Sequence, residues 1–236
     1  MTAPTTAPAW DGAGSLFAMG MRVCLLDDIG HPKVGATTCY TSDALVKLEL
    51  GLEYQEAKEV IQTNGAGIVC VNYAAPPTLK RGQIKTLQLC SPDPILLEMM
   101  IGGLVTYDAQ NNPIGYSAPE VGVENRPNGT SLEVWTRAVL QSAYARRLPY
   151  LHWVVPQSYI APTKTWELAA NAALTPDIDG YSIQDPNWGR GPMNDYQGPS
   201  DRVWQYLREA TLPDLSPAFH EIAQVSDPAL MTAGGT

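Results

Sequence analysis

The chain has 236 residues and a net charge of −9, and only 17% of its residues are charged, below the roughly 25% of a typical soluble domain. Its length suffices for one large or two small β domains. The acidic balance, with no Lys/Arg cluster beyond Arg146-Arg147, argues against a nucleic-acid binder, which normally carries a basic patch. A sparsely charged surface instead suits a subunit that hides its exterior against copies of itself.

Both ends of the chain are rich in Pro, Gly, Ala and Thr. We expect an extended N-terminal arm over residues 1–20, a β-rich domain over 21–212 and an extended C-terminal arm over 213–236. Such arms either fray or order against a neighbour. We find no secretory leader pattern, and the longest apolar stretch, residues 95–105, is too short to span a bilayer. We therefore expect a soluble protein made in the cytoplasm, with no membrane partner.

The clearest periodic pattern runs from residue 45 to residue 55, where apolar and polar residues alternate. Period two predicts a strand with one buried and one wet face. The apolar members are Val46, Leu48, Leu50, Leu52 and Tyr54; the polar face includes Lys47, Glu49, Glu53 and Gln55. A turn at residues 64–67 and apolar segments at 68–73 and 83–90 extend this strand into a long antiparallel hairpin and meander.

A short helix is predicted after this meander. Asp93 suits the N-cap, Pro94 the first helical position, and Gly102-Gly103 the end. Its apolar face includes Met99 and Met100, which we expect to pack on Leu48, Leu50 and Leu52 of the sheet.

The rest of the chain alternates between turns and strand-like segments. We expect strands at residues 104–109, 132–138, 150–155, 163–170 and 181–184, and a second short helix at 200–209. The whole pattern favours a mainly β fold, a sandwich or barrel with one or two short covering helices.

No catalytic, phosphate-binding or metal-binding motif is present, so we predict no enzyme activity, catalytic residue, cofactor or metal. The four cysteines do not have zinc-ligand spacing, and we interpret them as buried free thiols rather than two disulfides. The tryptophans, among them Trp135, Trp153, Trp166, Trp188 and Trp204, suit a core or a subunit contact, with a carbohydrate platform as the alternative.

Four stretches together resemble the major tail protein, or tail tube protein, family of long-tailed phages that infect actinobacteria. They cover about residues 45–196, and neither terminus is part of the resemblance. They are the long hairpin of residues 45–73; Lys80-Arg81-Gly82 through Leu87 and Cys90 to Asp93-Pro94 and Gly102; Asn128-Gly129 with Leu132-Glu133-Val134-Trp135 and Pro149-Tyr150; and Tyr181 with Asn187-Trp188-Gly189 and Gly191-Pro192.

This resemblance implies a structural virion protein of a non-contractile tail, assembled in the host cytoplasm. In that family, hexameric rings stack into a hollow tube through which DNA is ejected, and each subunit adds hairpin strands to a barrel around the lumen. Terminal arms and a long loop join successive rings. The implied partners are further copies of the chain, a tape-measure protein, a tail terminator and distal tail proteins.

We expect Lys47, Glu49, Glu53 and Gln55 to face the lumen, where an acidic wall would repel DNA phosphates, although Lys47 weakens this argument. Two alternatives stay open. One is another ring-forming tail or connector protein of related fold, and the other is a carbohydrate-binding β-sandwich module of a virion or cell surface.

Overall fold

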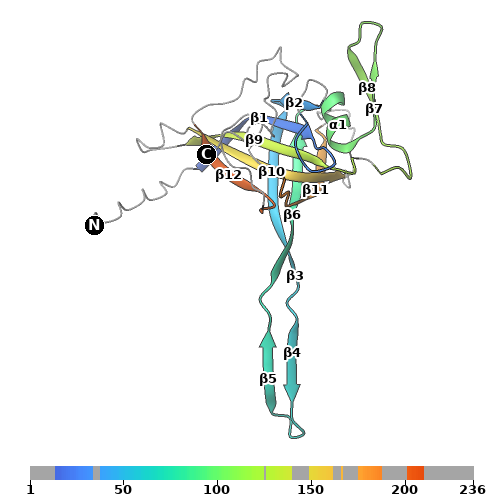
Figure 1. Ribbon diagram of the computed structural model, residues 1–236. Helices are drawn as coiled ribbons and strands as arrows, with labels where there is room; N and C mark the ends of the chain where they lie inside the picture. The colour runs from blue at the N-terminus through green and yellow to red at the C-terminus, as the bar shows by residue number, and fades with distance from the viewer. Residues whose placement is uncertain are drawn as a thin grey trace.

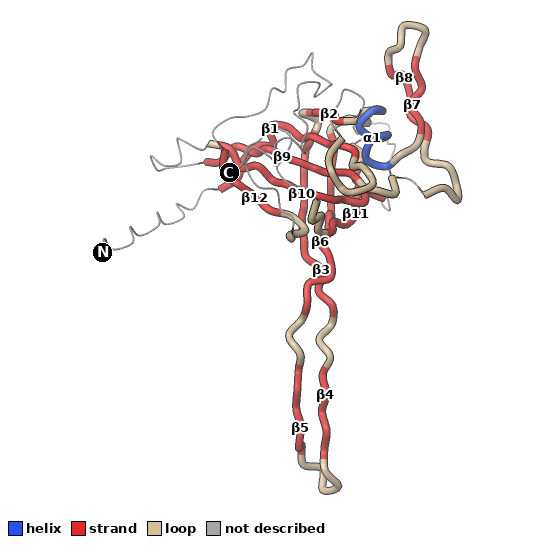
Figure 2. The backbone as a smooth tube through the Cα atoms, in the orientation of Figure 1, coloured by secondary structure: helices blue, strands red, loops and turns tan. Residues whose placement is uncertain are grey.

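The computed structural model of the chain describes residues 14–33, 38–124, 126–139, 149–161, 166, 175–187 and 201–209. It is mainly β, as predicted, with one helix among these residues (Figures 1 and 2). The main sheet holds β1 (Gly14–Leu25), β2 (Cys39–Ser42), β3 (Leu45–Gln55), β6 (Thr78–Leu89), β9 (Thr130–Val139), β10 (Tyr150–Ala161), β11 (Asp177–Ile183) and β12 (Gln205–Glu209). Two hairpins stand apart, β4 (Glu59–Thr63) with β5 (Val69–Ala74) and β7 (Leu104–Tyr107) with β8 (Pro113–Ser117), and α1 spans Pro94–Ile101.

The main sheet is antiparallel, with neighbours in the order β2-β1-β9-β10-β11-β6-β3. β10 shares one of its edges between two strands, because its first half pairs with β12 and its second half with β11. In the described part of the chain β2 and β3 end the sheet, so these strands form no closed barrel.

The long hairpin predicted from the alternating pattern is confirmed. β3 pairs with β6 over its whole length. Beyond the Gln55–Thr78 pair the same hairpin continues as the paired strands β4 and β5, which project away from the sheet (Figure 1). Its tip is built by Asn64, whose Oδ1 accepts hydrogen bonds from the N–H groups of Ala66 and Ile68 at 3.0 and 2.9 Å. Gly67 has φ +79°, a conformation that favours glycine.

The predicted helix is also confirmed, with both of its ends. The Asp93 side chain accepts hydrogen bonds from the N–H groups of Ile95 and Leu96, and Gly102 caps the C-terminal end. The helix lies against one face of the sheet and shares a core with it. That core includes Met21, Val23, Ile84, Leu87, Leu96, Met100, Leu132, Val134 and Ile178, all at most 2% exposed.

Three sequence expectations differ from the structure or lie beyond it. The segment at 200–209 is not a helix, because residues 205–209 form β12 and pair with the free edge of β10, a tertiary contact that overrides local spacing. β1 begins at Gly14, so residues 14–20 of the predicted arm belong to the sheet through pairing with β9. Residues 1–13, residues 210–236 and all of the strand predicted at 163–170 except Trp166 lie outside the described residues.

A cluster of ionisable and aromatic side chains lies on the sheet face opposite α1. Arg22 on β1 pairs with Glu133 on β9, and His152 Nε2 of β10 lies 3.1 Å from a Glu133 carboxylate oxygen. The Trp135 ring stacks on His152 with centroids 4.3 Å apart, and all four side chains are at most 1% exposed. Burial alone would raise the pKa of Glu133, but Arg22 and His152 outweigh it and hold the pKa well below its usual value.

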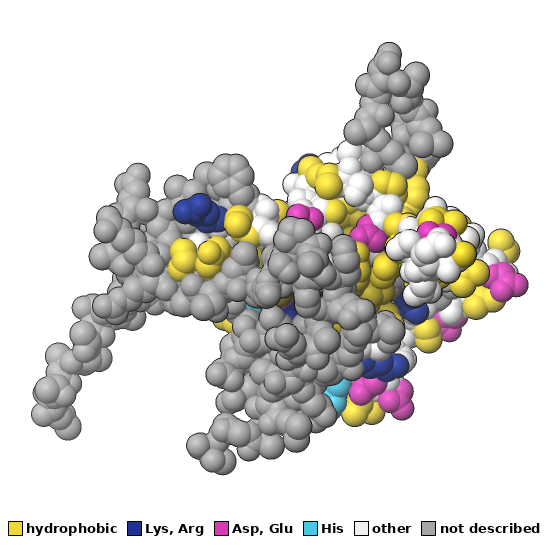
Figure 3. All heavy atoms as spheres, turned by 90° about the horizontal axis from the view of Figure 1, so that it is seen from above, with side chains coloured by type: hydrophobic (Ala, Val, Ile, Leu, Met, Phe, Trp, Pro, Cys, Tyr) yellow, Lys and Arg dark blue, Asp and Glu magenta, His cyan; other side chains and the backbone are white. Residues whose placement is uncertain are grey.

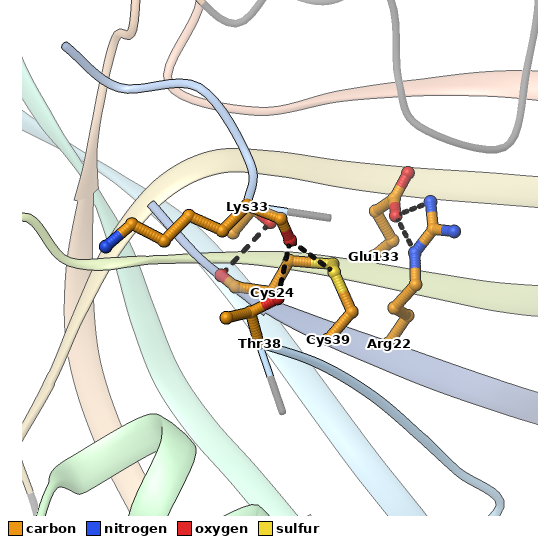
Figure 4. The surroundings of a disulfide bond; sticks show 7 residues. Arg22, Cys24, Lys33, Thr38, Cys39 and Glu133 are labelled. Atoms are coloured by element: carbon orange, nitrogen blue, oxygen red, sulfur yellow. Dashed lines mark hydrogen bonds and ion pairs between the residues drawn. A yellow bond between two sulfur atoms is a disulfide. The ribbon is translucent and has the colours of Figure 1, made fainter. Parts of the chain in front are cut away.

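The expectation of four buried free thiols is wrong. Cys24 and Cys39 form a disulfide that joins β1 to β2 (Figure 4). Cys70 and Cys90 are exposed thiols. The reason is the strand register, which places Cys24 directly opposite Cys39. The bond therefore fastens the short end strand of the sheet to its neighbour.

Thiol titration checks this assignment. We expect two thiols per native chain to react with a disulfide reagent such as DTNB, no more than two after unfolding without reductant, and four after reduction. The variant Cys70→Ser should lose one native thiol. Four reactive thiols in the unreduced, unfolded chain would contradict the bond. Reduction should lower the free energy of unfolding by about 3 kcal/mol, the value for closing a loop of this size.

Acid unfolding tests the buried ion pair. The folded-state pKa of Glu133 is about 2, below the ordinary glutamate value of 4.5, so its contribution to stability is fully present above pH 4.5 and is lost as the pH falls toward 2. Glu133→Gln leaves Arg22 buried without a carboxylate, and we expect the free energy of unfolding at pH 7 to drop by about 3–5 kcal/mol.

The matched control is Glu49→Gln, which removes an exposed partner of Lys47 and should change stability by less than about 1 kcal/mol. Equal effects of the two variants in urea titrations at pH 7 would contradict the special position of Glu133.

Candidate self-association surface

The projecting hairpin is the most exposed ordered part of the described chain. Every residue from Tyr54 to Ala74 is exposed, and both strands of its distal sheet are exposed along their full length. A two-stranded hairpin with no covering layer is at best marginally stable in water. Its outer edges also present backbone N–H and C=O groups that other strands can pair with.

The hairpin carries large apolar side chains in this exposed position. The register places Val60 opposite Tyr73 and Gln62 opposite Val71, so Val60, Val71 and Tyr73 share one face. They are 43%, 44% and 59% exposed, and Ile61, Ile68 and Val69 are 53–63% exposed. Monomeric soluble proteins rarely leave such a contiguous apolar patch in water. The hairpin therefore has the properties of a protein-contact surface.

The residues predicted to line a lumen lie along β3 from the body to the start of the projection. Lys47 and Glu49 are about half exposed and pair with each other at 2.7 Å. Gln55, the last residue of β3, is exposed. Glu53 is half-buried, because Lys80 and Arg81 of β6 form ion pairs with its carboxylate. What these residues face in an assembly stays a prediction.

A charged and aromatic cluster marks the point where the hairpin leaves the body. Glu53 accepts hydrogen bonds from Lys80 Nζ at 2.8 Å and from Arg81 Nε at 2.6 Å, and these bonds lower the pKa of Glu53 to about 2. The Arg81 guanidinium also lies 4.7 Å from the Tyr181 ring centroid, and Tyr181 stacks on Tyr159. The base of the hairpin is thus tied to β11 and β10.

The residues predicted to pack between helix and sheet divide into two groups. Met99 and Met100 are buried in the core, and Leu48 and Leu50 pack against that same core as partly buried side chains. Leu52 lies further out, where β3 leaves the body, and is 39% exposed. The alternation of apolar and polar residues along β3 continues through Leu52, although the core that would bury its apolar side chains ends before this residue.

An apolar groove of about 470 Å³, which was not predicted, lies beside β3. Its lining includes Leu48 and Leu50 of β3 together with Trp153 and Trp204. Trp204 Nε1 donates a hydrogen bond to the Gly51 carbonyl of β3 at 3.4 Å. Sequence spacing gave no sign of the groove, because its walls come from strands that are far apart in the chain.

The tryptophans named from the sequence do not form one platform. Trp135 is fully buried, Trp166 packs against the core, and Trp188 lies outside the described residues. Trp153 and Trp204 do come together, with ring centroids 6.3 Å apart, and the exposed Tyr206 lies 4.9 Å from Trp153.

The described residues contain no group of three or more His, Cys, Asp or Glu side chains arranged to hold a metal ion. Asp177 and Asp179, whose spacing resembles a fragment of a calcium loop, lie in β11. No helix in the described part of the chain is long and apolar enough to cross a membrane.

Comparison with known proteins gives no assignment: no protein-family model and no curated protein matches the chain.

Removal of the hairpin tests whether it belongs to the folding core. Replacing residues 58–75 by Asn-Gly removes only side chains that are exposed or half-buried, so we expect the free energy of unfolding to change by less than about 1 kcal/mol in urea titrations. Ile84→Ala, in the buried part of β6, is the comparison and should cost about 2–5 kcal/mol. A hairpin deletion as damaging as Ile84→Ala would show that the projection stabilises the monomer.

Proposed function

We propose that this chain is a structural subunit that assembles with copies of itself into stacked rings, forming the hollow tail tube of a long-tailed, non-contractile phage. The observation that carries the proposal is the projecting hairpin, whose exposed apolar side chains and outer strand edges suit contact with a protein partner. A self-assembling subunit supplies that partner as another copy of the chain. The low share of charged residues, 17%, fits a surface of which much is covered.

The resemblance to tail tube proteins gives the proposal its particular form. Its first stretch corresponds to β3, β4 and β5, its second runs through β6 into α1, and its third includes β9. In this proposal, six copies close a ring around a lumen that DNA passes through without specific binding. The tape-measure, terminator and distal tail proteins then set the length and ends of the tube.

The open main sheet supports ring formation. In the described chain β2 and β3 each have one edge without a partner strand. Pairing these edges between subunits would remove them, as closure does in barrels. In the proposed ring Lys47, Glu49, Glu53 and Gln55 face the lumen. Lys47 and the cations at the hairpin base are paired with carboxylates, which weakens their attraction for phosphate.

A carbohydrate-binding module is the second candidate, and the aromatic groove favours it. Trp153, Trp204 and Tyr206 bring three rings together beside a groove of about 470 Å³, and aromatic rings have the apolar surface that sugar rings stack on. A glycan array with no hits, together with tryptophan fluorescence unchanged by sugars, would remove this candidate. A connector or other ring-forming tail protein would instead give single closed rings.

Electron microscopy and sedimentation at rising concentration test the assembly. We expect the wild-type chain to form hollow tubes or stacked rings of uniform width. The double variant Val60→Glu, Val71→Glu places two carboxylates on the apolar face of the hairpin and should raise the concentration needed for assembly at least tenfold, equivalent to about 1.4 kcal/mol per contact.

The control is Ile29→Glu, which changes an apolar side chain that is 54% exposed on the body and should assemble like the wild type. A wild-type chain that stays monomeric in the presence of its tail-tip proteins would contradict the proposed function.

A further inference from the structure

The end strand β2 is attached to the body in a different way at each of its ends. Ser42 leads directly into β3, and the Ala44 carbonyl just beyond it accepts a hydrogen bond from the Cys90 N–H at 2.8 Å. Cys39, at the other end, is joined to Cys24 of β1 by the disulfide. Because β2 is only four residues long, its Cys39 end would open readily without this bond, as the ends of short edge elements do.

The sulfur pair is buried, but it lies at the margin of the sheet. Cys24 and Cys39 are both 0% exposed, yet β2 has no further strand on its outer side in the described part of the chain. β2 contacts α1 at the upper end of the molecule (Figure 1), and Figure 3, seen from above, shows hydrophobic side chains beside acidic ones at this end. A small oxidant or reductant therefore reaches the sulfur atoms when the end strand opens, which costs less free energy than unfolding the body.

The end strand is connected to buried groups on both faces of the sheet. Thr41 of β2 lies opposite Arg22, the buried cation that pairs with Glu133. On the helix side, Tyr40 Oη donates a hydrogen bond to Asp93 Oδ2 at 2.6 Å, and Asp93 is the N-cap of α1. Opening of β2 would therefore weaken the contact with the helix cap and admit water beside the buried ion pair.

We infer that the Cys24–Cys39 bond is a redox switch on this end strand, open as two thiols in the host cytoplasm and closed after the virion is released. The inference rests on the proposed function, which places assembly in the cytoplasm, where thiols are kept reduced. Closure is a thiol–disulfide exchange with a low-molecular-weight disulfide such as oxidised glutathione. The two cysteine thiols give up two protons and two electrons as their S–S bond forms, and the S–S bond of the oxidant breaks to give two thiols.

Closing the bond changes the edge that a neighbouring copy meets. In the proposed ring, the outer edge of β2 pairs with an edge of the next subunit. An edge strand that is already ordered loses less conformational entropy on binding than one that opens and closes. Oxidation therefore tightens a ring that has formed with thiols, and the released tail resists dissociation better than the tail inside the cell.

Assembly in two redox states tests this inference. The full-length chain with Cys70→Ser and Cys90→Ser retains only the Cys24–Cys39 pair. It is assembled in excess reduced glutathione, and half of the sample is then transferred to oxidised glutathione. On dilution, followed by sedimentation, we expect the concentration at which half of the subunits dissociate to be about tenfold lower after oxidation.

The matched control adds Cys24→Ala and Cys39→Ala to the same background, since alanine replaces a small buried thiol without introducing a hydroxyl. This control should dissociate at the same concentration in both media and match the reduced chain. An oxidised chain with a closed bond and unchanged dissociation would overturn the inference. A bond that stays closed at the glutathione ratio of a bacterial cytoplasm would also overturn it.

Hydrogen exchange of the unassembled chain separates failure of the inference from failure of the proposed function. Amides of residues 38–44 should exchange about tenfold faster in the reduced than in the oxidised monomer, because the end strand opens more often. Amides of residues 130–135 in β9 serve as the internal reference. Equal exchange in both states, with normal tubes, would overturn the switch and leave the tail tube proposal standing. Faster exchange in the reduced monomer, with no tubes or rings in either medium even with the tail-tip proteins, would overturn the proposed function and leave a redox-controlled strand.

Discussion

The antiparallel pairing of β3 with β6 connects the core of this protein to its most exposed surface. At one end of the ladder Leu45 lies opposite Leu89, and both are buried; at the other end Gln55 lies opposite Thr78, and both are exposed. Because the two strands run on from the packed sheet into β4 and β5, the body fixes the direction of the projection. The interactions of Glu53 with Lys80 and Arg81 lie at the transition between the two regions.

Around β1, β9 and β10, both faces of the described sheet carry buried side chains. Met21 and Val134 face the helix side, whereas Arg22, Glu133 and His152 are buried on the other. A buried ion pair is costly unless its partners stay aligned, so this cluster disfavours any shift of register between β1 and β9. β1 also carries the disulfide to β2, and together these contacts make the body a firm support for the projecting hairpin.

Local patterns predicted the parts of the fold that depend on neighbouring residues. Alternation identified β3, Asp93 and Gly102 marked the ends of α1, and the Asn-Gly sequence at residue 64 located the hairpin tip. Features that depend on distant partners were missed: residues 205–209 became a strand by pairing with β10, and Cys24 met Cys39 through the register of β1 and β2. The exposure of the hairpin was also hidden, since alternation alone cannot tell a face buried in a core from one such as Leu52 and Tyr54 that stands in water.

The charged residues between β3 and the start of β4 affect how an isolated copy of the chain behaves in solution. An exposed apolar hairpin with free edges is a template for disordered aggregation of isolated copies. Glu56 and Lys58 just before β4, and Glu59 at its start, interrupt the apolar sequence, and charged residues at such positions act as gatekeepers against unspecific pairing. In the proposed assembly, this charged segment would slow unspecific pairing of free copies.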